Sequence, residues 1–435
     1  MIKNKLYAFI DQNKFIEFLS KLNSDFHTSE KNILFIEPYG ASISLIKRGI
    51  EKGWNIIILT ADADLRVVPQ QVIDSVKLAI KIDTANEMII MDLVKSLYSM
   101  MIFHAVIPGF EYFVPIAAKV SRYLNLPGIA LNQVMQLRRK DLMRLQLKRV
   151  RFNIPRFCII HSIKELDNAS TTIGFPLVCK PIDAAGSVNV KKVNNKSEAV
   201  IAARRILEGN DVLWGHKLSN SVLIEEYVEG KEYSLEGVVI NGVVTHFSVT
   251  EKKVFDQSEF IEIGHIVNPP ISTQVKQVLE HYIENVIVVL GANYCPFHAE
   301  IRIDHQGKPV LMEMAARLAG DKIGDLITLS RGINYFDYVY AAYTGEALPF
   351  YSAPASPVGI RFFYRPEVAR YSKVLGLEIA KQYQIEDIQF YYPPAMPIPS
   401  FPKPLRRLGH VIMKNDNYVQ LCQQLEQVDA SISFC

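Results

Sequence analysis

The segment "KNILFIEPYGASISLIKRGIEKGWNIIILTAD" (residues 31–62) limits the possible folds most strongly. Two apolar runs, Ile33–Ile36 and Ile56–Leu59, flank a helical stretch that follows Gly40 and ends at Gly53. A strand, a crossover helix and a second buried strand form a βαβ unit, and such a unit requires a parallel sheet. The sequence therefore predicts α/β layers at this end of the chain.

The same order of strand, turn and helix returns in "MMIFHAVIPGFEYFVPIAAKVSRYLNLPG" (100–128). We expect this first region to end near residue 125. The chain has 435 residues, and at about 100–200 residues per domain this length predicts two to four domains. More domains must therefore follow the parallel sheet.

Two hairpins are predicted further along the chain. Residues 221–249 read as strand, and Asn241-Gly242 between alternating apolar residues is a strong signal for a two-residue turn. Residues 297–314 read as a second hairpin that turns at residues 304–307. Other elements are predicted from periodicity, caps and prolines: two short strands around a loop at 175–193, a helix at 197–207 capped by Ser197, a helix at 337–345, and an extended connection at 393–404.

A basic helix is predicted at residues 138–155, with seven Lys or Arg between positions 138 and 151. One interpretation is a patch for nucleic acid or a membrane. The other is a solvated basic face, with Leu142, Leu145 and Val150 facing the core. The formal net charge of the chain is only +3, which favours the second interpretation. We expect neither nucleic acid nor a membrane as a partner.

The second hairpin carries two glutamates. With a four-residue turn, Glu313 lies on the face of Glu300, two residues beyond the position opposite it. A turn two residues longer places them directly opposite, and an odd-length loop separates them. Facing like charges are destabilising, and Mg²⁺ held by both carboxylates and by phosphate oxygens would compensate. Ordinary ion pairs are the alternative, and the hairpin alone does not decide. The basic partners for such pairs are Arg302, Arg317 and Lys322.

Two more segments suggest phosphate and sugar contacts. Lys180 ends an apolar strand, and a nearly buried lysine requires an anion. Gly186 and Ser187 follow in a loop whose backbone amides would approach a phosphate. Further on, Glu232 offers a carboxylate to two ribose hydroxyls. Taken singly, a Gly-Ser turn and an acidic turn are also common without any ligand.

In order and spacing, these segments resemble the ATP-grasp superfamily over roughly residues 31–345. The segments are "KDLMR" (140–144), "FPLVCKP" (175–181), "AAGSVNV" (184–190), "IEEYVEGKEYSLEG" (224–237), "HAEIRID" (298–304) and "LMEMAAR" (311–317). Within the superfamily, the chain looks most like the dipeptide-forming L-amino acid ligases of the bacilysin-ligase type. That likeness lies in "HAVIPGFEYFVPIAAKV" (104–120), "FIEIGHIVNPP" (260–270), "MAARLAGDKIGDLITLSRGIN" (314–334) and "RLGHVI" (407–412).

The resemblance implies an α/β and α+β chain with the ATP-grasp fold. It implies a Rossmann-like domain at 1–125, an ATP-grasp domain at 126–345 with a mobile lid at about 163–227, and an antiparallel C-terminal subdomain at 346–435 that completes the substrate site. The implied activity is an ATP-dependent carboxylate-amine ligase. It would join an amino acid or a related carboxylate to an amine or amino acid through an acyl phosphate, and would release a dipeptide or amide, ADP and phosphate.

The resemblance also implies a role for each matching residue. For ATP, Lys140 and Lys180 would contact the phosphates, and Gly186 and Ser187 would lie in the loop that covers them. Glu225, the backbone of Glu226 and Val228, and Met312 would contact adenine, and Glu232 would contact the ribose. For Mg²⁺, with Mn²⁺ as an alternative, they are Glu300 and Glu313. For the amino-acid substrate, they are Glu262, His265, Arg317 and Gly320, with His265 and Arg317 as the catalytic pair.

The chain departs from the usual superfamily pattern at three positions. Ala315 stands where many relatives carry an asparagine as a third metal ligand, and Ala316 replaces a proline. Asn189 stands in the phosphate loop where a glycine is usual. Asparagine tolerates a positive φ better than most residues, so we expect the loop to form.

Two alternatives are set against this function. One is another ATP-grasp ligase or carboxylase for a different acid, although the single glycine of "DAAGSVNV" argues against a biotin-type lid. The other is a nucleotide-binding protein that has lost catalysis. The joint presence of Lys140, Lys180, Glu300, Glu313 and Arg317 argues against that loss.

The setting is predicted from simpler features. Five cysteines lie far apart with no C-x-x-C pair, which argues against a zinc site or a disulfide framework. The first residues lack the apolar core of a signal peptide, and no uncharged apolar run reaches the ~18 residues of a membrane span. We expect a cytoplasmic enzyme for small molecules, with the oligomeric state open and a homodimer as the commonest arrangement.

Overall fold

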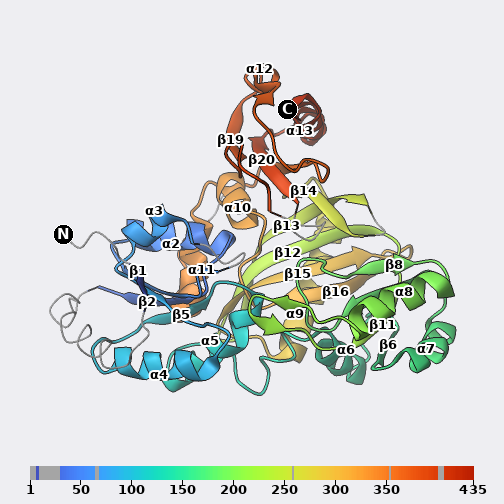
Figure 1. The fold of residues 1–435 in the computed structure, drawn as a ribbon, viewed down its shortest axis with the longest axis horizontal. Coiled ribbons are helices and arrows are strands. Elements are labelled where there is room, and N and C mark those ends of the chain that lie inside the picture. Colours follow the sequence, from blue (N-terminus) through green and yellow to red (C-terminus); the bar gives the residue numbers. More distant parts are fainter. Residues whose placement is uncertain (1–5, 9–29, 64–67, 257–258, 352–353, 400–405) are drawn as a thin grey trace.

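The computed structural model describes residues 6–8, 30–63, 68–256, 259–351, 354–399 and 406–435. Figure 1 shows an N-terminal α/β domain, a central antiparallel sheet, a smaller lid on the opposite side, and a C-terminal subdomain above. The predicted mixture of parallel and antiparallel layers is confirmed.

The N-terminal domain has a parallel sheet in the order β1-β4-β3-β2-β5. Strands β2 (Asn32–Ile36) and β3 (Asn55–Thr60) pair in parallel and are joined by α2 (Ala41–Glu51), as the βαβ pattern predicts. The remaining elements are β1 (Leu6–Ala8), α3 (Gln70–Ser75), β4 (Leu78–Lys81), α4 (Glu87–Tyr98), β5 (Ala105–Pro108) and α5 (Val114–Tyr123).

Both faces of this sheet are covered, which explains its unbroken apolar strands. Leu34 and Ile36 pack in a core with α4 and α5. Ile33 and Phe35 pack with α2, but also with α10 (Ile323–Arg331) and α11 (Tyr335–Thr344) of the central body. The N-terminal domain therefore shares a core with the helices that follow the second predicted hairpin.

The central sheet is antiparallel, in the order β16-β15-β12-β13-β14-β17-β20-β19. Asn241 and Gly242 form the predicted two-residue turn between β12 and β13, with φ of 50° and 77°. In chain order, the first six strands of the central sheet are β12 (Lys231–Ile240), β13 (Val243–Asp256), β14 (Ile261–Val267), β15 (Cys295–Ile303), β16 (Pro309–Ala315) and β17 (Val358–Tyr364). Helix α9 (Thr273–Leu290) packs on this sheet. No helix in the described part of the chain has the length and apolar character needed to cross a membrane.

The lid is a four-stranded sheet in the order β6-β11-β7-β8 with two helices on it. Its elements are β6 (Phe157–Ile160), α7 (Leu166–Ile173), β7 (Leu177–Pro181), β8 (Lys191–Val193), α8 (Lys196–Leu207) and β11 (Val222–Glu226). The predicted N-cap of α8 was wrong. Asn195 caps the helix instead of Ser197, because its side chain accepts a 3.0 Å hydrogen bond from the Glu198 amide.

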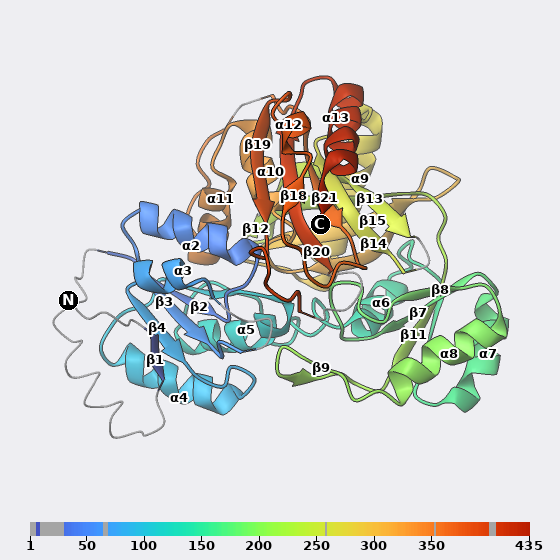
Figure 2. The same cartoon turned by 45° about the horizontal axis from the view of Figure 1, so that its top comes forward.

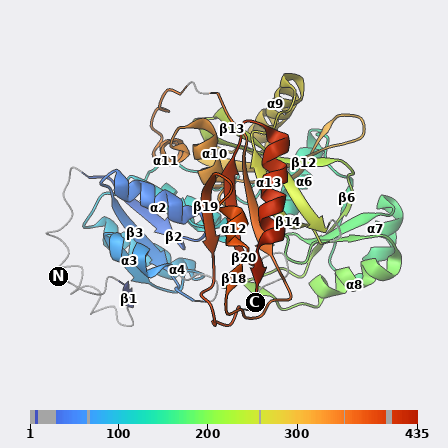
Figure 3. The ribbon, with the colours of Figure 1, turned by 90° about the horizontal axis from the view of Figure 1, so that it is seen from above.

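The C-terminal subdomain extends the central sheet with β19 (Ile385–Phe390) and β20 (Arg407–Lys414), and α13 (Tyr418–Ser431) packs on it. Viewed from above, it lies between the N-terminal domain and the lid (Figure 3). Residues 393–399 have neither helix nor strand, as predicted, and residues 400–404 of that connection lie outside the described residues.

The basic helix is α6 (Lys140–Arg149), and its predicted core face was wrong. Leu145 and Val150 are exposed and Leu142 is half-buried, whereas Lys140 and Arg144 lie inside with Met143 and Leu147. The physical reason is that both basic side chains have buried partners on other elements, described below. A charge can be buried when it is paired and hydrogen-bonded.

Candidate active site

The two glutamates of the second hairpin lie directly opposite each other, Glu300 on β15 and Glu313 on β16. The predicted four-residue turn was wrong. Ile303 pairs with Pro309, so the loop has five residues, 304–308, an odd number that by itself would separate the two carboxylates. A β-bulge restores the parity, because Leu311 pairs with Ile301 while the next paired residue is Glu313.

The bulge also explains why the side chains of Met312 and Glu313, although consecutive, are both half-buried. Leu311 and Met314 are buried in the core with α9, whereas Met312 and Glu313 between them are half-buried. In a regular strand, consecutive side chains point to opposite faces. The extra residue opposite Glu300 lets both positions avoid the core face.

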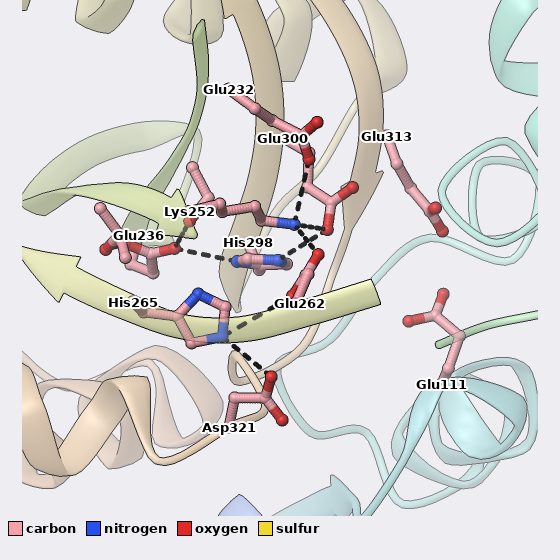
Figure 4. Close-up of polar contacts among 12 residues, drawn as sticks. Glu111, Glu232, Glu236, Lys252, Glu262, His265, His298, Glu300, Glu313 and Asp321 are labelled. Carbon is pink, nitrogen blue, oxygen red and sulfur yellow. Dashed lines mark hydrogen bonds and ion pairs between the residues drawn. The ribbon is translucent and has the colours of Figure 1, made fainter. Parts of the chain in front are cut away.

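Lys252 of β13 lies at the centre of the site (Figure 4). Its ammonium is 2.5 Å from Glu300, 2.7 Å from Glu262 and 3.4 Å from Glu232, and its side chain is 1% exposed. Burial lowers the pKa of Lys252, but the three carboxylates outweigh it and raise the pKa well above its usual value. Sequence reasoning missed this residue. The sequence feature that pointed to Lys252 was the pair Lys252-Lys253 in a strand. Successive side chains of a strand point to opposite faces, so one of the two lysines must face inward.

Lys252 also lowers the pKa of Glu300, whose side chain is half-buried. Burial raises the pKa of Glu300, but Lys252 and His298 bring it well below the usual range. His298 lies 3.3 Å from Glu300 and 2.9 Å from Glu236, a buried acid that also accepts hydrogen bonds from Ser234, Ser248 and Thr250. The first acid of the hairpin is therefore fixed by a chain of buried groups.

The two predicted phosphate lysines each contact a carboxylate. Lys140 Nζ is 2.8 Å from Glu313 Oε1 and donates to the carbonyl of Ala184 in the lid loop at 2.7 Å. Lys180 Nζ is 2.5 Å from Glu225 Oε2. Both side chains are nearly buried, and burial lowers the pKa of Lys180 although Glu225 opposes the shift.

Glu225, predicted at the adenine, lies between Lys180 and Arg144 of α6. Arg144 Nε donates to Glu225 at 2.5 Å, and its Nη2 donates to the carbonyl of Met312 at 2.7 Å. Burial raises the pKa of Glu225, but Arg144 and Lys180 bring it below the usual value. Arg144 was missed, although it lies in the segment 140–144 that resembles the family, because the other basic residues of this helix were expected to form a solvated face.

The other residues predicted to contact the nucleotide have different ion-pair partners. Glu232 pairs with Arg302 at 2.8 Å, and Arg302 also donates to the carbonyl of Val228 at 2.8 Å. The Glu226 carboxylate pairs at 2.6 Å with the exposed Arg156, so it joins none of the central ion pairs.

Three residues of the loop predicted to cover the phosphates (184–190) have a positive φ. Gly186, Ser187 and Asn189 have φ of 66°, 55° and 58°. Asn189 therefore adopts the expected positive φ. Ala184 and Ala185 of the same loop pack in the core of the N-terminal domain, which places the loop between the lid and that domain.

The predicted substrate residues fall into two groups. His265 is buried, with Nε2 2.9 Å from Asp321 and 3.6 Å from Glu262. Asp321 follows Gly320 and also accepts from Arg407 of β20 at 2.7 Å. Burial raises the pKa of Asp321, but Arg407 and His265 bring it below its usual value.

Arg317 is held separately from the ion pairs around Lys252. Its Nε donates to Glu111 at 2.5 Å, and its guanidinium lies over the ring of Phe110 at 5.4 Å. Figure 4 shows the carboxylates of Glu111 and Glu313 pointing toward one another. Glu111, Asp321 and Arg407 were all missed. They lie in segments that resemble the ligases (104–120, 314–334 and 407–412), but their ionic partners are distant in sequence.

Two acidic groups could be considered for a cation. Glu262, His265 and Asp321 have ligand atoms within 4.8 Å of one another, but one of these donors is a histidine nitrogen. Both groups have basic partners: Lys252 and Arg407 for this one, and Lys252 and Lys140 for Glu300 and Glu313. Glu300 and Glu313 offer only oxygen donors from facing carboxylates, which is the donor set that Mg²⁺ prefers. Ala315, opposite His298, adds no ligand, as its sequence indicates. The hairpin pair is therefore the donor set that fits the ion.

Comparisons with known proteins agree with this arrangement. Residues 173–325 match the family model of the ATP-grasp domain. The chain is 25% identical to alanine–anticapsin ligase of Bacillus subtilis over 228 residues, 48% of this chain and 47% of that protein. The L-amino acid ligase structure from Bacillus licheniformis aligns with a TM-score of 0.78 at 21% identity and covers 94% of this chain and 99% of that one.

These comparisons confirm the resemblance and the fold. An uncharacterised protein of Sinorhizobium fredii is 24% identical over 337 residues, 74% of this chain and 67% of that protein. The chain spans about half the length of the alanine–anticapsin ligases that it matches.

Proposed function

Residues 173–325 match the family model of the ATP-grasp domain, and from this match we propose that the protein is an ATP-dependent carboxylate-amine ligase. It joins an amino acid, or a related carboxylate, to an amine or a second amino acid and gives a dipeptide or amide, ADP and phosphate. The observation that carries the proposal is the direct opposition of Glu300 and Glu313, with Lys140 on the second of them and Lys252 on the first.

The reaction has two steps. In the first, a carboxylate oxygen of the substrate attacks the γ-phosphorus of ATP, the bond to the bridging oxygen breaks, and ADP leaves. In the second, the amine attacks the carbonyl carbon of the acyl phosphate, phosphate leaves with the bonding electrons, and the nitrogen loses a proton. Positioning and charge neutralisation are the main contributions of a protein to such chemistry.

The side chains divide these tasks by charge. Lys140 and Lys180 neutralise phosphate oxygens, and Arg317 binds the acyl phosphate, because its planar fork can contact two oxygens. Glu300 and Glu313 would hold Mg²⁺, or Mn²⁺ in its place, which neutralises phosphate charge when it is bound. Glu225, Glu226, Val228 and Met312 form the adenine side, with Gly186 and Ser187 as the covering loop.

Lys252 supports the proposal that these regions act as one site. It contacts Glu232, the proposed ribose acid, Glu300, a proposed metal ligand, and Glu262, a proposed substrate acid. His265 and Gly320 would complete the amino-acid side, where His265 orients the nucleophile or polarises the carbonyl. Asp321 and Arg407 hold His265 in place.

A phosphate-release screen over pairs of amino acids tests the function, with mass spectrometry of the products. We expect phosphate release that needs both substrates and a divalent cation, with chelation abolishing it and Mg²⁺ or Mn²⁺ restoring it. The product mass should equal the sum of the two substrates less one water. Tight ATP binding without phosphate release for any pair would instead indicate a nucleotide-binding protein without ligase chemistry.

A further inference from the structure

A small hairpin leaves the lid between α8 and β11 and reaches the N-terminal domain. It consists of β9 (Val212–Leu213) and β10 (His216–Lys217), joined by a two-residue turn at Trp214-Gly215. Figure 2 shows β9 extending from the lid toward the N-terminal domain. A two-stranded ribbon alone has marginal stability in water, so contacts at its tip matter for where it lies.

The turn contains an unusual residue for its conformation. Trp214 has a φ of 58° and Gly215 of 78°. Hairpins of this type favour Asn-Gly or Gly-Gly, because both central residues need a positive φ. A bulky aromatic residue there is an outlier, and it persists only where surrounding contacts hold it.

Those contacts come from aromatic residues of the N-terminal domain. The Trp214 ring lies 4.4 Å from the ring of Tyr39 and 4.6 Å from that of Phe110. His216, two residues further on, stacks on Tyr112 at 5.6 Å with an interplanar angle of 11°. Ring contacts therefore join the tip of the hairpin to the N-terminal domain.

Phe110 connects this contact to the proposed active site. Its ring faces Trp214 and also lies under the guanidinium of Arg317 at 5.4 Å. The next residue, Glu111, accepts the 2.5 Å hydrogen bond from Arg317 Nε. The ring of Phe110 therefore contacts both Trp214 and Arg317, and the carboxylate of Glu111 also holds Arg317.

We propose that Trp214 is a positioning residue that couples closure of the lid to the placement of Arg317 through Phe110. The proposal rests on the proposed ligase function for the role of Arg317. When the lid lies on the N-terminal domain, Trp214 fixes Phe110, and Phe110 with Glu111 fixes the guanidinium beside the acyl phosphate. Without the ring, ATP still binds, but Arg317 is less well placed and water reaches the acyl phosphate.

Trp214→Gly separates this role from the stability of the turn. Glycine suits the positive φ at this position, so we expect the variant to fold with an unchanged unfolding temperature. We expect amide formation to fall about 10- to 100-fold, with the KM for ATP changed little and more than one phosphate released per amide. Trp214→Phe keeps an aromatic ring and should restore most of the coupling. One phosphate per amide and a wild-type rate in Trp214→Gly would overturn the proposal.

A second readout does not depend on knowing the substrates. The chain has two tryptophans, so Trp54→Phe leaves Trp214 as the single reporter. We expect acrylamide to quench Trp214 less after β,γ-imido-ATP and Mg²⁺ are added. The matched control is Trp214→Phe, in which Trp54, packed edge-on against Tyr340 at 4.8 Å, should show no change.

The two readouts also distinguish the proposals. Unchanged quenching of Trp214, with nucleotide binding verified by equilibrium dialysis, contradicts the coupling and leaves the ligase function standing. A nucleotide-dependent decrease in quenching with no amide from any substrate pair supports closure through Trp214 and contradicts the ligase function.

Discussion

Lys252 is the residue on which the charge balance of the site depends. Its ammonium faces Glu232, Glu262 and Glu300, and only 1% of its side chain is exposed. Removing a buried partner leaves uncompensated charge, which costs more than the pair itself contributes.

Lys252→Met should therefore lower the free energy of unfolding by about 3–5 kcal/mol, as measured by urea denaturation. Lys253→Met is the matched control, because the next side chain is 35% exposed and pairs with Glu251 at 2.6 Å. We expect the control to cost about 0–1 kcal/mol. Equal costs for the two variants would contradict the central position of Lys252.

Glu313 tests the metal assignment at the same scale. Glu313→Gln keeps the shape but removes the charge that faces Glu300, so ADP formation should fall by about 10²–10³-fold. A coupled ADP assay with both substrates present measures it. Glu386→Gln, which changes an exposed acid on β19, should keep wild-type turnover. Wild-type turnover in Glu313→Gln would rule out the carboxylate as a ligand.

At the scale of elements, α6 joins three parts of the protein through its buried basic side chains. Arg144 contacts Glu225 of β11 in the lid and the carbonyl of Met312 on β16. Lys140, one turn earlier, contacts Glu313 and the carbonyl of Ala184. The helix therefore links the lid sheet, the loop at 184–190 and strand β16.

Arg144→Met should destabilise the protein by about 3–5 kcal/mol, because Glu225 would lose a buried partner. Thermal unfolding followed by circular dichroism measures the effect. Arg149→Met, on the exposed end of the same helix, should stay within about 0.5 kcal/mol of wild type. A loss of stability in Arg144→Met as small as that in Arg149→Met would show that the buried ion pair of Arg144 with Glu225 does not stabilise the position of α6.

Elements with a strong local signal could be predicted from the sequence. The βαβ unit and the Asn241-Gly242 turn follow from apolar runs and from residues that favour a positive φ. The buried face of α6 could not be predicted, because the partners that bury Arg144 are distant in sequence. Glu225 lies more than 80 residues away and Met312 more than 160. The register of Glu300 and Glu313 depended on the bulge at Met312, for which the sequence carries no local signal.

The same limit applies to the site as a whole. Motifs located Lys140, Lys180, Glu300 and Glu313, and the structure brings each of them into contact with another charged group of the site. Lys252, Glu111 and Arg407 lie outside these four motifs. Tertiary packing brings their side chains to the site. The roles of all these residues, and the domain boundaries, remain predictions.

At the scale of the whole molecule, the site is assembled where all parts of the chain meet. The N-terminal domain supplies Glu111, the lid supplies Lys180, the central sheet supplies the acids, and the C-terminal subdomain supplies Arg407. Arg407 reaches into the site from β20 and bonds both Asp321 and the carbonyl of Glu262.

Arg407→Met should therefore slow ligation by about 10-fold or more while nucleotide affinity changes little, because His265 loses the support of a fixed Asp321. Steady-state kinetics and equilibrium dialysis with ATP measure the two quantities. The neighbouring Arg406→Met is the control and should leave both unchanged. A loss of ATP affinity that matched the loss of rate would place Arg407 on the nucleotide side instead.

Activation of a carboxylate by phosphorylation can be followed through the oxygen that the carboxylate transfers to phosphate. The substrate acid is labelled with heavy oxygen in its carboxylate, and the released phosphate is analysed by mass spectrometry. Ligation through an acyl phosphate predicts phosphate that carries one labelled oxygen for each amide formed. Unlabelled phosphate, with amide still produced, would contradict the account.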